Sequence, residues 1–187
     1  MKYVSINRLS DFEFHDSELT LVSFEDQCLI LNATYLNVHK GIEQNPHKVD
    51  MEIALASLTF EDFVIWSYEP GRSWKRDEKG QYYTDEPQII LSGKEANDRF
   101  ITQIKNGITD FDLGVKEGSI YFIDGIAEDT FFTLCFMFQN VSIEWDNFKA
   151  ERGIINKSGY VCTYLPRFRY VCTLFRNQKR CVPLRGT

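Results

Sequence analysis

Apolar and polar residues alternate with a period of two along most of residues 19–146, a pattern typical of half-buried β-strands. The first two expected strands are 19–24 and 28–36, with a turn at 25–27 between them. Further strands are expected at 51–60, 63–68, 82–92, 121–123 and 131–145, the last as one bent strand or two. Within the segment 51–60 we expect inward-facing side chains at Met51, Ile53, Leu55, Leu58 and Phe60.

One segment departs from this alternation. Ser92 followed by Glu95 matches a capping box, in which each side chain bonds a free backbone N–H at the start of a helix. Apolar residues then recur at helical spacing, and Gly107 suits a left-handed C-terminal cap. The spacing predicts one helix over about 93–106. Seven or eight strands with one helix predict a mainly β (α+β) fold, either a β-sandwich or an open barrel with the helix against one end.

The 187 residues are 43% hydrophobic and 26% charged, which excludes collagen, coiled coils and wholesale disorder. The N-terminus shows no signal-peptide pattern, and no apolar run reaches the roughly 20 residues that cross a bilayer. We therefore expect a cytoplasmic bacterial protein without a membrane partner. No Cys-x-x-Cys pair occurs, so we expect reduced, mostly buried thiols at Cys28, Cys135, Cys162, Cys172 and Cys181.

Charge divides the chain into two parts. Residues 1–150 hold 26 acidic and 13 basic side chains, whereas residues 151–187 hold one acidic and eight basic ones. We expect an acidic β-rich domain at 1–150 and a basic, Cys- and aromatic-rich tail at 151–187. The motif Tyr-Val-Cys-Thr occurs at 160–163 and again at 170–173, so the tail reads as a hairpin of edge strands. The alternatives are a disordered basic extension, an arm for nucleic acid or an acidic partner, and an accidental extension of the reading frame. Nucleic acid is not expected as a partner of the acidic domain.

Three histidines supply the candidate chemistry, because imidazole beside carboxylate can bind a metal or act as a general acid–base. His15, His39, His47 and Asp50 would form such a site if they met at one end of a sheet. Their spacing matches no helix-borne metal motif, and the chain has no nucleophile elbow and no phosphate loop. We therefore expect no metal, no cofactor and no catalytic residue, with the histidines bonded to backbone or solvated.

The long connection after residue 68 concentrates aromatic and basic residues inside the acidic domain. Tyr, Trp and Arg are frequent at the centres of protein interfaces. We therefore select Tyr68, Arg72, Trp74 and Tyr82 as binding residues. In the alternative interpretation Trp74 folds back over the end of the sandwich, and residues 77–80 are an ordinary hairpin turn.

The segment Phe14-His15-Asp16-Ser17, followed by Glu18-Leu19 and two alternating strands, resembles small bacterial proteins with an N-terminal Phe-His-Asp signature. Some of these are classed as immunity proteins of polymorphic toxin systems. The resemblance covers about 25 residues and implies a β-rich, cytosolic, non-enzymatic protein that binds and neutralises a partner. It also implies that Phe14, His15, Asp16 and Ser17 fix the end of a strand rather than perform chemistry.

We therefore expect an immunity-like binding protein whose acidic surface neutralises a basic protein partner, because complementary charge accelerates association. One alternative is a small enzyme or metal-dependent protein that uses the His/Asp residues. A further alternative is a β-barrel domain that binds a small ligand in its mouth.

Overall fold

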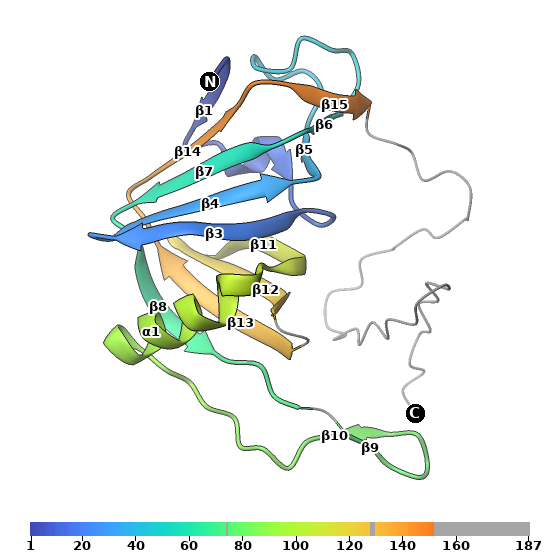
Figure 1. The fold of residues 1–187 in the computed structure, drawn as a ribbon, viewed down its shortest axis with the longest axis vertical. Coiled ribbons are helices and arrows are strands. Elements are labelled where there is room, and N and C mark those ends of the chain that lie inside the picture. The colour runs from blue at the N-terminus through green and yellow to red at the C-terminus, as the bar shows by residue number, and fades with distance from the viewer. Residues whose placement is uncertain (74, 128–129, 152–187) are drawn as a thin grey trace. The chain divides into compact units, whose positions relative to one another are not determined.

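The computed structural model describes residues 1–73, 75–127 and 130–151 (Figure 1). It contains three antiparallel sheets of four or five strands, a two-stranded ribbon and one α-helix. The predicted mainly β, α+β architecture is confirmed, and the described sheets do not close into a barrel. The described strands outnumber the seven or eight that we expected, because several are only two to four residues long.

The first sheet has five strands in the order β1 (Tyr3–Ile6), β14 (Asn140–Trp145), β7 (Ala56–Glu61), β4 (Cys28–Thr34) and β3 (Glu18–Glu25). Strands β3 and β4 form the predicted hairpin, whose turn residues Asp26 and Gln27 both have positive φ. Two successive positive φ values match the twist of paired strands, which explains this tight connection.

The second sheet has four strands in the order β11 (Thr109–Glu117), β12 (Ile120–Ala127), β13 (Thr130–Met137) and β8 (Val64–Glu69). The apolar segment 131–145 is therefore two strands in different sheets, β13 and β14. A long excursion after β8 carries the ribbon of β9 (Lys75–Arg76) and β10 (Tyr82–Tyr83). Most of the strand expected at 82–92 is thus irregular chain.

The third sheet continues the first one beyond a bend. Its order is β15 (Phe148–Glu151), β6 (Met51–Ile53), β5 (Leu36–Val38) and β2 (Phe12–Glu13). Strands β4 and β5 are separated only by Tyr35, which has positive φ, and β6 and β7 by Ala54 and Leu55. Leu55 is 51% exposed, so the prediction that it faces the core is wrong. The alternation breaks there because the Ala54 N–H bonds the carbonyl of Asn147 across the bend.

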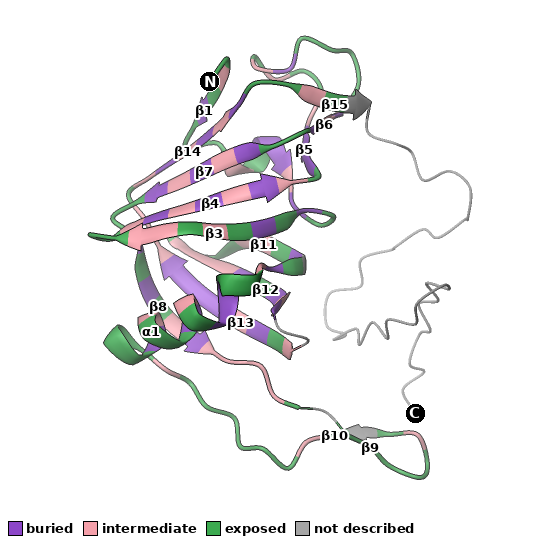
Figure 2. Ribbon diagram, viewed as in Figure 1, coloured by how far each residue is buried: buried purple, intermediate pink, exposed green. Residues whose placement is uncertain are grey.

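The first two sheets share one aromatic core. Phe136 of β13 meets Phe60 of β7 at a ring-centroid distance of 5.9 Å and Phe63 at 5.1 Å. Buried residues alternate with partly exposed ones along β4 and β7 (Figure 2), as expected for strands with one solvated face. Leu19 and Ile108 also exchange two backbone hydrogen bonds of 2.9 and 2.7 Å, which join β3 to the start of β11. The described sheets therefore pack as a sandwich whose two layers are also joined by backbone hydrogen bonds at Leu19 and Ile108.

The predicted helix is α1 (Gly93–Gln103), followed by the 3-10 turn η2 (Ile104–Asn106). Ser92 is the N-cap residue, but its side chain makes no capping hydrogen bond, so the expected capping box is wrong. Gly107 ends the helical segment with a positive φ of 97°, but its ψ of 167° is extended, so the expected left-handed cap is wrong. Ala96 and Phe100 are buried, and the Phe100 ring contacts Tyr68 and Phe132 of the second sheet.

A second 3-10 turn, η1 (Leu9–Asp11), precedes β2. Cys28 is partly buried and Cys135 buried, both as free thiols, while the other three cysteines lie outside the described residues. The expectations for the basic tail also lie outside them, apart from Glu151 at the end of β15. Among the helices described, none is long and apolar enough to cross a membrane.

Candidate functional site

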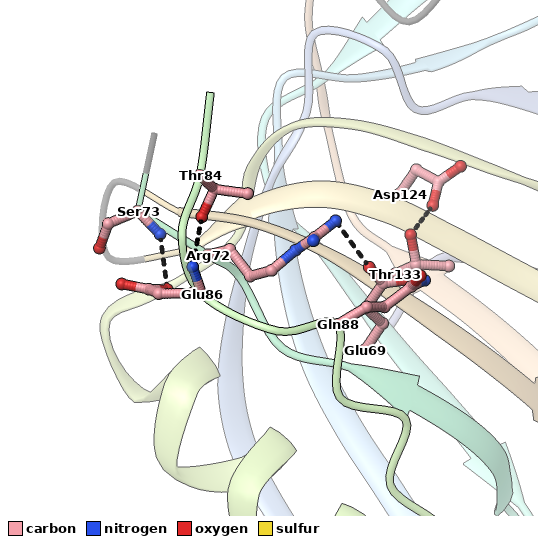
Figure 3. Close-up of polar contacts among 8 residues, drawn as sticks. All are labelled: Glu69, Arg72, Ser73, Thr84, Glu86, Gln88, Asp124 and Thr133. Atoms are coloured by element: carbon pink, nitrogen blue, oxygen red, sulfur yellow. Dashed lines mark hydrogen bonds and ion pairs between the residues drawn. The ribbon is translucent and has the colours of Figure 1, made fainter. Parts of the chain in front are cut away.

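A row of polar side chains crosses the outward face of the second sheet, formed by β11, β12, β13 and β8, which we call the four-stranded sheet from here on. Register pairs Asp112 of β11 with Asp124 of β12, Asp124 with Thr133 of β13, and Thr133 with Glu69 of β8. Neighbouring strands lie about 4.8 Å apart, so these four residues span about 14 Å. We call Asp112, Asp124, Thr133 and Glu69 the polar row; Figure 3 shows its last three members.

Each end of the polar row meets a basic side chain. His15 Nδ1 lies 3.6 Å from Asp112 Oδ1 at one end, and Arg72 Nη2 lies 3.4 Å from Glu69 Oε1 at the other. Thr133 donates a hydrogen bond of 2.6 Å to Asp124 Oδ1, so this carboxylate contacts a hydroxyl group (Figure 3). The negative charge of the row is therefore least balanced at Asp124, whose contact is a hydroxyl group rather than a basic side chain.

The direct opposition of Asp112 and Asp124 is unfavourable for the fold, because like charges at opposed positions of an antiparallel pair repel. Both side chains are exposed, so solvent weakens this repulsion. The arrangement creates a concentration of negative charge on a rigid sheet, where a cation from outside the molecule would be attracted.

Apolar side chains lie on both sides of the polar row. On one side Phe131 is opposite Ile126, and on the other Phe122 is opposite Cys135. Trp66 occupies the bulge of β8 beside Cys135. Trp66 is 58% and Phe131 40% exposed, which is unusual for large aromatic side chains within strands. Together with the polar row, Phe122, Ile126, Phe131 and Trp66 form what we call the docking face.

A pocket of about 310 Å³ opens on this face and is lined by Val115, Lys116, Phe122, Asp124, Thr133 and Cys135. Gly114 shapes it, because a Cβ there would lie 2.9 Å from the Phe122 ring. The ring therefore lies across β11, and Lys116 Nζ donates a hydrogen bond of 3.2 Å to Cys135 Sγ. The pocket thus combines an aromatic wall with one carboxylate, that of Asp124, and one ammonium group, that of Lys116.

The outward face of the five-stranded sheet provides a contrast within the same molecule. Its central cross-strand neighbours are small and polar: Ser142 opposite Thr59, and Ser57 opposite Asn32. Such side chains are normal for the solvated face of an antiparallel sheet. The edge strands of the five-stranded sheet do expose Ile6 and Val22, so the difference is that the docking face exposes aromatic side chains, Trp66 and Phe131.

The edges of the four-stranded sheet are less suited to a partner than its face. Leu91 exchanges two backbone hydrogen bonds of 2.9 and 2.8 Å with Tyr68 and so covers part of the edge of β8. Strand β11 carries two register shifts. Covered or bulged edges discourage strand addition, so a partner would dock through the side chains of the face.

The four residues selected as binding residues have different environments. Tyr68 is fully buried and its hydroxyl donates to Gln103 Oε1, so its selection as a surface contact is wrong. Arg72 is half-buried, with 19% of its side chain exposed, at the end of the polar row. Trp74 lies outside the described residues, as does the side chain of Tyr82, whose backbone pairs with Arg76.

The excursion that follows β8 is held by polar contacts at its base. The Ser73 N–H bonds Glu86 Oε2, and Gln88 Nε2 donates to Glu69 Oε2 at 2.8 Å (Figure 3). Lys75 Nζ lies 2.7 Å from Asp85 Oδ2. The hydrogen bond from Lys75 lowers the pKa of the Asp85 carboxyl, and the same bond raises the pKa of Lys75.

This ion pair predicts a pH dependence. A lowered carboxyl pKa stabilises the ribbon at pH values above the ordinary value of 3.8, and this contribution is lost as the pH falls through the lowered value. We therefore expect the Asp85 carboxyl resonance in a ¹³C NMR titration to have its midpoint below that value. Lys75→Gln should move the midpoint up toward the ordinary value, because the largest cause of the lowered pKa is the hydrogen bond from Lys75, while the backbone hydrogen bond to Asp85 remains. An unchanged midpoint would show that the pair does not form.

The histidines do not assemble the alternative metal or catalytic site. His39 Nδ1 lies 3.5 Å from Asp50 Oδ2, whereas the His47 ring packs against Phe148 and His15 lies beside Asp112. Nowhere in the described ranges do three His, Cys, Asp or Glu side chains converge as metal ligands would. The described residues therefore do not bring His15, His39, His47 and Asp50 together into one site, as that alternative requires. The absence of a metal and of a cofactor stays a prediction.

The Phe14–Ser17 motif lies against the start of β11. The Phe14 ring packs on Phe111 at 6.1 Å, and Ser17 Oγ donates a hydrogen bond of 3.4 Å to the carbonyl of Tyr35. His15 contacts the polar row, and Asp16 is exposed. The motif thus holds the segment before β3 and adds one basic side chain to the candidate site.

Sequence reasoning missed Trp66, Phe131, Asp112 and Asp124. The available signal was the segment 131–138, in which apolar residues occupy both alternating positions. That pattern is typical of a strand with both faces covered.

Comparison with known proteins gives no further assignment: no family model, no curated protein and no solved structure matches this chain.

Proposed function

We propose that this protein binds a basic protein partner on the docking face and neutralises it in the manner of an immunity protein. The observation that carries the proposal is the row of carboxylates lying between exposed aromatic side chains on a sheet face that should otherwise be solvated. The bacterial and cytoplasmic setting rests on the resemblance of the Phe14–Ser17 motif.

The two kinds of side chain would do different work. Exposed carboxylates attract a basic surface over roughly one screening length, about 8 Å at physiological salt, and raise the association rate. Large apolar side chains supply the contact energy, since aromatic residues dominate the centres of interfaces. Trp66 and Phe131 would therefore limit the dissociation rate, while Asp112 and Asp124 would control association.

The proposal predicts the effect of charge removal on a simple probe. We expect a synthetic peptide that repeats Leu-Thr-Arg-Thr, so that leucine and arginine lie on the same face of an extended strand, to bind the full chain. The matching Leu-Thr-Glu-Thr peptide should not bind. Asp112→Asn/Asp124→Asn should weaken the arginine peptide about tenfold, because each exposed ion pair contributes up to about 1 kcal/mol. Isothermal titration calorimetry at about 0.05 M and about 0.3 M salt should show the difference shrinking as salt rises.

The matched control is Glu25→Gln/Glu144→Gln, which removes the same charge from the five-stranded sheet. Its affinity for the arginine peptide should stay within about twofold of the parent. Equal weakening by both double variants would mean that the peptide responds only to net charge, and the docking face would lose its assignment.

A further inference from the structure

We infer that the docking face recognises a β-strand of the basic partner that presents an apolar, a basic and an apolar side chain in that order on one face. This inference rests on the proposed function and specifies the chemistry of the partner. It follows from the order and spacing of the rows on the face.

The rows repeat at the period of a β-strand. Along β12 the outward side chains are Phe122, Asp124 and Ile126, and along β13 they are Thr133 and Phe131. Cys135, at the third position of β13, is buried and accepts a hydrogen bond from Lys116, so Phe122 and Trp66 supply the apolar surface of that row. Each row is two residues from the next, a step of about 6.7 Å. Alternate side chains of an extended partner strand have the same spacing, so three of them meet the three rows in register.

A helix fits this spacing less well. Its side chains at positions i, i+4 and i+8 cover about 12 Å but turn by about 80° around the helix axis, whereas the two apolar rows lie about 13 Å apart on one sheet face. Stacked sheets keep the mean directions of their strands within about 30°. A strand aligned with β12 and β13 therefore keeps its register across three rows.

The centre of the face suits a guanidinium group. A guanidinium there would lie between Asp112 and Asp124 and within reach of the Phe122 ring, so a cation–π contact with that ring would add to the attraction of the carboxylates. The same row already holds one guanidinium, since Arg72 lies half-buried beside Glu69. Placing a second carboxylate opposite the first strengthens the preference for a cation.

The test uses two hairpin peptides of identical composition. One presents Leu–Arg–Leu on its binding face and the other Arg–Leu–Leu, with threonine on the opposite faces. Titrated into the full chain and followed by amide chemical shifts, the Leu–Arg–Leu hairpin should bind at least about tenfold more tightly. Trp66→Ser should weaken it by a similar factor without changing the thermal melt of the free protein.

The outcomes separate this inference from the proposed function. Equal affinity for the two hairpins, with salt dependence retained, would overturn the register inference and leave the docking face intact. Failure of both hairpins and of the arginine–leucine peptide to bind would overturn the proposed function as well. A dimer in sedimentation equilibrium that Trp66→Ser dissociates would assign the face to a second copy of this chain and overturn the inference.

Discussion

Replacing Phe136 with alanine is expected to lower the free energy of unfolding by about 3–5 kcal/mol, which is the usual cost of removing a fully buried phenylalanine ring. Phe136 has no exposed surface and contacts Phe60 and Phe63 across the two sheets. Alanine would leave a cavity between sheets that hold each other in place. Urea denaturation of the full chain measures the change.

The same strand provides the control for this prediction. Phe131 lies on β13 with its side chain on the opposite face and is 40% exposed. Phe131→Ala should cost less than about 1 kcal/mol of stability, yet weaken the arginine–leucine peptide severalfold. Equal destabilisation by the two substitutions would show that the outward face is covered within the molecule and is not a docking face.

The second large effect is expected at Gln103. Its Oε1 accepts the hydroxyl hydrogen of Tyr68, its Nε2 donates to Thr130 Oγ1 at 3.0 Å, and Thr130 donates to the carbonyl of Ala127. This chain of hydrogen bonds links α1 to three strands of the four-stranded sheet. Gln103→Leu should lower the free energy of unfolding by about 1–3 kcal/mol, because a buried hydroxyl loses its acceptor.

A double-mutant cycle separates hydrogen bonding from packing in this case. Tyr68→Phe removes the hydroxyl group, so Tyr68→Phe/Gln103→Leu should be more stable than Gln103→Leu alone. Strictly additive losses in urea denaturation would indicate that the two side chains are not coupled. The hydrogen-bonded chain would then not be what fixes α1 to the sheet.

The regular parts of the fold were predictable from local patterns. The β3–β4 hairpin and α1 follow from alternation and from helical spacing within short segments. The bends between the first and third sheets were not predictable, because Tyr35 and Leu55 lie inside apolar runs that read as continuous strands. Only pairing between distant segments, such as Ala54 with Asn147, breaks those strands.

The candidate site was less predictable than the fold, for a related reason. The polar row takes one residue from each of four strands, so no short sequence motif contains it. Tyr68 is of a residue type frequent at binding interfaces, but it lies in the core. Trp66, two residues away, is exposed. A bulge in β8 sets this difference, and bulges depend on the partner strand as much as on sequence.

Hydroxyl-radical footprinting of the full chain, with and without the Leu–Arg–Leu hairpin, tests the assignment of the docking face most directly. We expect reduced oxidation at Trp66, Phe131 and Phe122 when the hairpin is bound. Oxidation should be unchanged at Ile6 and Val22, which are exposed on the five-stranded sheet. Reduced oxidation at Ile6 and Val22, with Trp66 and Phe131 unchanged, would contradict this assignment.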